Sequence, residues 1–149
     1  MKNNFLIILI LFTNFVFSQE KGDITEPWSK SLGIMIAPQG GIDLTRIDDG
    51  FSNQSNVFVV ANFAKGKNTF TPFYSVTNSL GMAYSRSFLE NYGMYVVANK
   101  KVLADGGYLG IGATRSVGNA SVFVEVGSLW NTWSPGFYLG AFIPLTFKI

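Results

Sequence analysis

The last segment of the chain, Phe137 to Ile149, alternates strictly between two kinds of side chain. Successive side chains of a β-strand point to opposite faces, so this pattern predicts a strand with one unbroken apolar face. In a soluble domain, an apolar terminal strand promotes aggregation. In a closed barrel within a lipid bilayer, the last strand pairs with the first and its outer face contacts acyl chains. The apolar set is Phe137, Leu139, Ala141, Ile143, Leu145, Phe147 and Ile149.

Similar short segments recur along the chain and predict an all-β protein. They are separated by turn-rich stretches, and no helical period follows the first residues. We therefore expect a single up-and-down antiparallel β-barrel of about eight strands. The expected strands are 31–38, 55–64, 69–77, 80–88, 92–100, 107–115, 120–128 and 136–148.

The lengths of the expected connections alternate as well. If the first strand runs outward, the outer connections are 39–54, 78–79, 101–106 and 129–135, and the inner ones are 65–68, 89–91 and 116–119. All outer connections except 78–79 are longer than every inner one. Membrane barrels have long external loops and short periplasmic turns, so the lengths favour that architecture.

The first residues predict a secretory signal peptide. Lys2 gives a positive start, an apolar stretch runs from Phe5 to Phe17, and Phe17-Ser18-Gln19 offers a cleavage point. The stretch is too short for a stable membrane span. We expect a signal peptide at 1–18, a polar lead-in at 19–30 and the barrel domain at 31–149.

Two absent residue types exclude several classes of function. The chain has no Cys, which excludes disulfides, thiolate chemistry and a lipid anchor on cysteine. It has no His, the commonest general base and metal ligand. The net charge is only +2, and no basic cluster exceeds Lys100-Lys101, which argues against a nucleic-acid partner. No cofactor is expected.

The scarcity of charge indicates which strand face points outward. The polar face of a soluble sheet would carry Lys and Glu. Here it carries Ser, Thr, Asn and Gly, with almost only Glu125 as a charge within the strands. Small side chains suit the filled interior of a narrow eight-stranded barrel, so we expect the apolar face to contact lipid. The expected interior bulk comes from Phe58, Phe73, Phe123 and Phe142.

Two features do not follow this division of the faces. Arg86 and Arg115 fall on the apolar face, but both lie near the inner ends of their strands, where long side chains reach the headgroups. Strand 92–100 does not sort into two faces and stays unassigned.

Glu125 is the only carboxylate that we expect inside the barrel. No His or nearby acid completes a catalytic pair with it. We therefore expect a structural lumen carboxylate, which either accepts hydrogen bonds from lumen hydroxyls or pairs with a Lys or Arg of another strand.

Aromatic and acidic residues outside the strand interiors have two interpretations each. Trp130 and Trp133 could stack on sugars, but we favour an interfacial aromatic belt that also contains Trp28 and Tyr138. The aspartates of the first outer connection could bind calcium, but their spacing does not match the known calcium loop. A solvated external loop is the preferred interpretation for Asp43, Asp48 and Asp49.

The end of the chain carries a resemblance to a known class. Tyr138, Gly140, Ile143 and Leu145, followed by Phe147 and Ile149, look like the C-terminal insertion signal read by the barrel-assembly machinery. With the signal peptide and the eight strands, the chain resembles the small outer-membrane β-barrel class, and its leader looks like those of Bacteroidota. The resemblance implies an outer-membrane location, with outer-membrane lipid and the assembly machinery as partners.

The expected function is that of a non-enzymatic integral outer-membrane β-barrel with an envelope structural, surface-contact or small-ligand role. Barrel enzymes of this size, such as lipid A deacylases and palmitoyltransferases, use a catalytic His, which this chain lacks. The alternative is a soluble secreted or periplasmic β-barrel that binds an apolar ligand.

Overall fold

The computed structural model describes residues 27–148. The expected signal peptide, most of the lead-in and Ile149 lie outside the described residues. The elements are β1 (Ser29–Asp43), a 3-10 turn η1 (Ile47–Asp49), β2 (Ser52–Lys65), β3 (Asn68–Ser75), β4 (Ser79–Leu89), β5 (Tyr92–Lys101), β6 (Gly107–Val117), β7 (Ala120–Leu129) and β8 (Pro135–Lys148).

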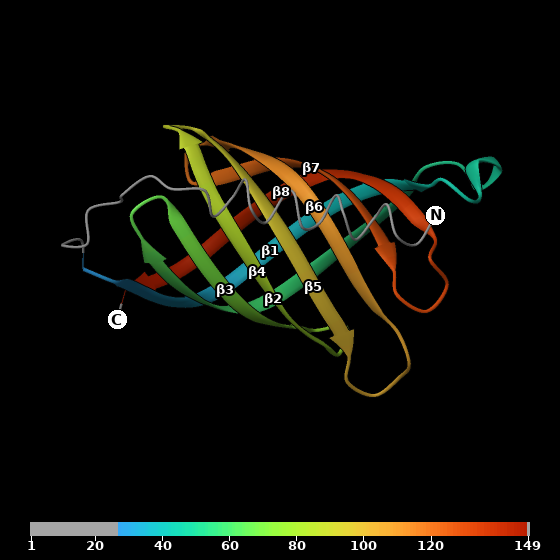
Figure 1. The fold of residues 1–149 in the computed structure, drawn as a ribbon, viewed down its shortest axis with the longest axis horizontal. Coiled ribbons are helices and arrows are strands. Elements are labelled where there is room, and N and C mark those ends of the chain that lie inside the picture. The colour runs from blue at the N-terminus through green and yellow to red at the C-terminus, as the bar shows by residue number, and fades with distance from the viewer. Residues whose placement is uncertain (1–26, 149) are drawn as a thin grey trace, which may run out of the picture.

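The eight strands close into one barrel, as the sequence predicted (Figure 1). Each strand is antiparallel to the next, and β8 returns to pair with β1 through register partners such as Ile36 with Ile143. Closure leaves neither β1 nor β8 with a free edge inside the barrel wall. No helix within 27–148 is long and apolar enough to cross a membrane.

Solvent exposure confirms the predicted facing of the strands. The apolar set of β8 points away from the barrel axis, with Leu145 54% and Ile143 39% exposed. Val124 on β7 is 48% exposed, whereas its chain neighbours Phe123 and Glu125 are buried. The unassigned strand, β5, turns Tyr95 inward, where it is 5% exposed.

The two ends of the barrel differ in their connections. At one end, here called the turn end, strands are joined by the two-residue turns 66–67, 90–91 and 118–119. At the other, the loop end, the connections are 44–51, 76–78, 102–106 and 130–134. Every loop-end connection is longer than every turn, including 76–78, which the sequence had placed at 78–79.

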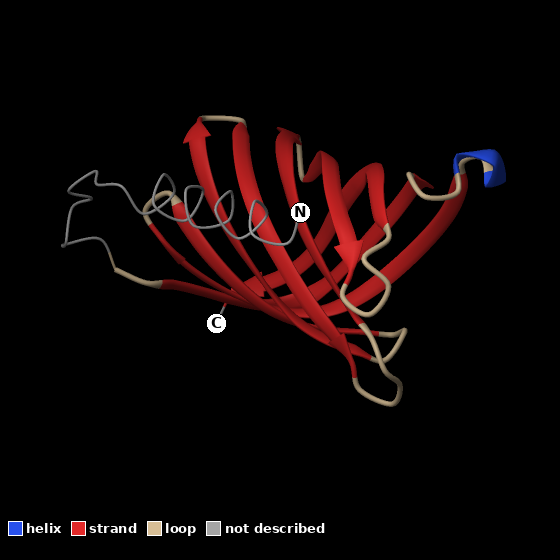
Figure 2. Ribbon diagram, turned by 45° about the vertical axis from the view of Figure 1, so that its right-hand side comes forward, coloured by secondary structure: helices blue, strands red, loops and turns tan. Residues whose placement is uncertain are grey.

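One boundary prediction was wrong. Residues 39–43 and 52–54 belong to strands, so that the β1–β2 hairpin projects at the loop end and carries η1 at its tip (Figures 1 and 2). The sequence placed 39–54 in an outer connection, partly because glycine, as in Gly40-Gly41, is common in turns. In the structure these glycines lie in β1, and a Cβ on Gly41 would overlap the ring of Tyr138. They allow close approach of aromatic rings to the strand.

Candidate functional site in the barrel interior

A carboxylate held by two tyrosines lies inside the barrel. Glu125 of β7 is 9% exposed. The Tyr95 hydroxyl, from β5, donates to Glu125 Oε2 at 2.5 Å, and the Tyr108 hydroxyl, from β6, donates to Oε1. The three strands are consecutive in the barrel, so these hydrogen bonds link neighbouring strands through their side chains.

Glycines on the neighbouring strands make room for the two tyrosines. Tyr95 is the register partner of Gly112, and a Cβ there would lie 2.5 Å from the ring carbon that bears the hydroxyl. A Cβ on Gly127 would overlap the Tyr108 hydroxyl itself. Each tyrosine therefore approaches bare backbone more closely than a side chain there would allow, with its hydroxyl at the carboxylate.

Aromatic side chains fill the space beside this cluster. The rings of Phe123 and Phe142 stack with centroids 4.3 Å apart, and Tyr95 meets the Phe142 ring edge-on at 5.8 Å. Phe58 and Phe73 form a second edge-on pair at 5.2 Å. These are the four phenylalanines that the sequence predicted as interior bulk. They make the interior a packed core, as expected for an eight-stranded barrel.

Polar side chains of β1, β2 and β3 satisfy one another in the same interior. The Ser75 hydroxyl donates to Asn56 Oδ1 at 2.6 Å, and the Thr71 hydroxyl donates to Asn62 Oδ1 at 2.8 Å. The Asn62 amide in turn donates to the Ser31 hydroxyl at 3.2 Å. Within 27–148, no buried side-chain nitrogen or oxygen lacks a hydrogen-bond partner. The interior thus meets the condition for a stable buried polar network.

Both oxygens of Glu125 are engaged by donors, and the chain has no His to act as its catalytic partner. Among the described residues, no group of three or more His, Cys, Asp or Glu is placed to hold a metal ion.

The sequence placed Glu125 inside but did not identify its partners. The structure places phenolic hydroxyls there, from strands 17 and 30 residues away in sequence. The available signal was the set of inward glycines on β6 and β7, because bare backbone inside a barrel provides space for a large ring. Tyr95 was hidden because its strand carries apolar residues on both faces.

The tryptophans of the expected belt lie at both ends of the barrel. Trp28 precedes β1 at the turn end, with Lys65 Nζ 6.0 Å from the ring centroid. Trp130 and Trp133 lie in the β7–β8 loop at the loop end. All three side chains are exposed.

Tyr138 does not belong with them, and this part of the belt prediction was wrong. Its ring centroid lies 5.9 Å from that of Tyr108, and it packs against Gly41 and Gly136. The reason is the strand period: Tyr138 neighbours the outward Phe137 and Leu139, so it must point inward.

The remaining predicted residues of the strands lie on β8 and at the end of β1. Ile143, Leu145 and Phe147 point outward from β8, whereas Gly140 lies on its inward face; Ile149 is outside the described residues. Asp43 ends β1 and accepts hydrogen bonds from the Thr45 N–H at 2.8 Å and the Thr45 hydroxyl at 2.6 Å.

The other loop acids and the two arginines also lie near barrel ends. Asp48 and Asp49 are exposed in η1. Arg86 and Arg115 lie near the turn end, and the Arg115 guanidinium carbon is 5.5 Å from the ring centroid of Tyr92.

Comparison with known proteins gives structural likeness without a sequence family. No protein-family model and no curated protein matches the chain. One similar solved structure is a designed protein from the de novo design of transmembrane β-barrels. It is 19% identical, with a TM-score of 0.50, and the match covers 85% of this chain and 98% of that one. Neisserial surface protein A (NspA) aligns at 13% identity with a TM-score of 0.45, over 82% of this chain and 100% of that chain. At such identity the first likeness shows the fold alone: the chain has the fold of a designed transmembrane β-barrel.

Proposed function

We propose that this protein is a non-enzymatic integral outer-membrane β-barrel, whose role is envelope structure or surface contact through its loop end. The proposal rests on the distribution of apolar and polar side chains, which is the reverse of that in a soluble protein. Large apolar side chains cover the outside of the barrel, while Glu125 and the hydroxyl of Ser75 are buried and hydrogen-bonded within. Such an exterior is unfavourable in water and favourable against acyl chains.

The height of the apolar surface agrees with a bilayer. On β8 the outward apolar series runs from Phe137 to Phe147, and its ten residue steps cover about 33 Å along the strand. With a strand tilt of about 40°, that length projects to about 25 Å along the barrel axis, the height of the lipid-facing band of membrane barrels. Trp28 at one end and Trp130 at the other would then lie at the two headgroup levels.

The filled interior argues against a pore. Phe123, Phe142 and Tyr95 pack across the space beside Glu125, so an ion would have to displace a packed aromatic core. We therefore expect no stepwise ion conductance when the purified protein is incorporated into a planar bilayer. Discrete channel openings would contradict the sealed interior.

Biogenesis would follow from the same assignment. The leader would direct export, and the outward residues of β8, with Ile149, would be presented to the barrel-assembly machinery. Because β8 must find β1 to close the barrel, an assembly step that holds the C-terminal strand is mechanically reasonable.

Fractionation of expressing cells tests the proposal. The mature protein should remain in carbonate-washed outer membranes and migrate differently on gels before and after heating. Protease added to intact cells should cut within the loop 44–51, the longest connection of the loop end. Recovery in the soluble periplasm without detergent would overturn the proposal in favour of a soluble barrel that binds an apolar ligand.

A further inference from the structure

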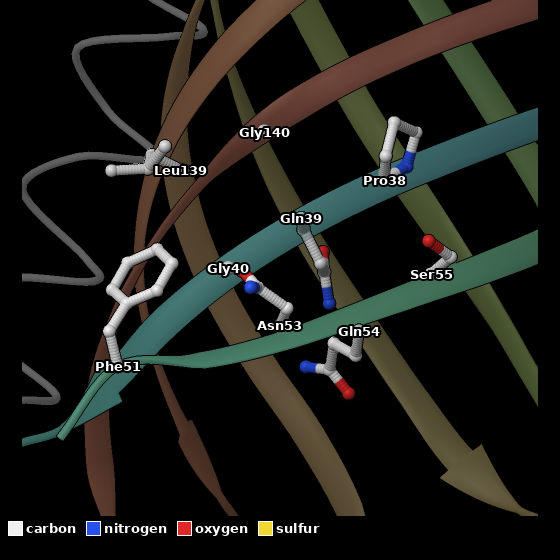
Figure 3. A pocket seen from close by; sticks show the side chains of 9 residues that line it. All are labelled: Pro38, Gln39, Gly40, Phe51, Asn53, Gln54, Ser55, Leu139 and Gly140. Atoms are coloured by element: carbon white, nitrogen blue, oxygen red, sulfur yellow. The ribbon is translucent and has the colours of Figure 1, made fainter.

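An open hollow of about 440 Å³ lies on β1, β2 and β8 near the loop end (Figure 3). Gly40 is one of its lining residues, and its missing side chain interrupts the outward row of β1. Figure 3 shows Phe51, Pro38 and Leu139 around it. A Cβ on Gly40 would overlap the Phe51 ring, so the glycine is needed for this shape. None of the lining residues is charged.

The hollow lies where the outward surface changes from apolar to polar. A single row of register partners crosses four strands, from Val124 through Leu139 and Gly40 to Asn53. Val124 and Leu139 are exposed hydrocarbon, Gly40 contributes bare backbone, and Asn53 contributes an exposed amide. Because strands in a barrel are tilted, a row perpendicular to them climbs from the apolar band toward its upper boundary.

The polar side of the hollow has backbone groups that no strand of the barrel uses. Pairing of β2 with β3 begins at Phe58, and the Val57 carbonyl accepts from the Val76 N–H. Alternate residues of a strand direct their backbone groups to the same side, so those of Asn53 and Ser55 point past the end of β3. Each presents one N–H donor and one carbonyl acceptor at this edge.

These groups define the chemistry of a ligand. A hydroxyl both donates and accepts, so it can pair with N–H and carbonyl groups side by side. A phosphodiester only accepts and is normally held by Arg or Lys, which the hollow lacks. The uncharged edge therefore complements an uncharged, hydroxyl-bearing headgroup, and the adjoining Leu139 and Val124 complement an acyl chain.

We propose that the outward hollow at Gly40 binds one amphiphile with an uncharged, hydroxyl-bearing headgroup, its acyl chain lying over Leu139 and Val124. This inference rests on the proposed membrane location, because it requires the apolar side of the row to lie in lipid. It adds a selective lipid site to a surface that otherwise contacts lipid without preference.

The test is a titration of the full mature protein in phosphatidylcholine nanodiscs, followed by amide NMR. The probes are dodecyl maltoside and dodecylphosphocholine, which share a chain length and differ in headgroup. Dodecyl maltoside should give saturable shifts at Gly40, Asn53 and Ser55, and dodecylphosphocholine should not. Asn53→Leu keeps the backbone groups but removes the exposed side-chain amide that lines the hollow beside them. The apparent Kd should therefore rise about fivefold to tenfold, as expected for one lost hydrogen bond.

Two further variants separate binding at the hollow from general effects of mutation. Asn131→Leu alters an exposed asparagine of the β7–β8 loop and should leave the Kd unchanged. Gly40→Leu fills the hollow and should abolish the shifts. Equal responses to both probes, or no saturable shift in a protein that has inserted, would overturn the lipid site alone. Failure to insert into nanodiscs would overturn the proposed membrane function together with it.

Discussion

The two tyrosines that hold Glu125, here called the clamp, allow a prediction about stability. Removing both tyrosine hydroxyls should destabilise the protein, and replacing Glu125 as well should restore most of that stability. Replacing Tyr95 or Tyr108 by Phe keeps the ring against its glycine but removes one donor from the buried carboxylate. Leaving a buried hydrogen-bonding group without its partner costs about 1–3 kcal/mol, so each single change should lower the free energy of unfolding by about 2 kcal/mol. The double Phe variant should lose about 4 kcal/mol or more, because the carboxylate then has no donor.

Adding Glu125→Leu to the double variant should then recover most of the loss. Replacing both sides of a buried polar interaction by apolar groups of similar size is nearly neutral, whereas removing one side is not. The free energies would be measured by equilibrium urea unfolding in phospholipid vesicles, with tryptophan fluorescence as the signal. Tyr74→Phe is the control, because that hydroxyl donates to Asn78 at 2.7 Å in an exposed position and its loss should change stability by less than about 0.5 kcal/mol. A triple variant no more stable than the double one would refute the buried clamp.

Two further substitution pairs test the glycine contact and the facing of the wall. Gly127→Ala should lower the free energy of unfolding by about 1–3 kcal/mol, because the new methyl group overlaps the Tyr108 hydroxyl. Gly93→Ala should cost less, because the atoms nearest to a Cβ on Gly93 are 3.1 Å away from it. Equal losses of stability in urea unfolding would argue against the contact between Gly127 and Tyr108. Val124→Arg, midway along β7, should cost about 2–4 kcal/mol in vesicles, whereas Val117→Arg at the turn end should cost about 0–1 kcal/mol. If both arginines were tolerated equally, the outer face of the wall would not lie in hydrocarbon.

The sequence by itself determined most of the strands of the barrel wall and the direction in which their side chains point, because that direction follows from the local geometry of the backbone. A strand alternates its side chains whatever its neighbours are, so the series from Phe137 to Phe147 fixed both the existence of β8 and its outward face. The same period placed Glu125 inside. Where the pattern weakened, the sequence decided less. The faces of β5 stayed unassigned because this strand carries apolar residues on both sides. The end of β1 was misplaced because Gly40-Gly41 has no side chains from which a period could be recognised.

Only the tertiary structure decided what meets across the interior. The register between strands sets Tyr95 opposite Gly112 and Gly112 opposite Glu125, and no local rule relates residues so distant in sequence. Closure also pairs Gly41 of β1 with Tyr138 of β8, whose ring takes the space that a Cβ on Gly41 would need. Alternation of side chains is a property of a single strand. The clamp and the hollow at Gly40 instead depend on how several strands are aligned. The energy that fixes that alignment comes from contacts that exist only in the closed barrel.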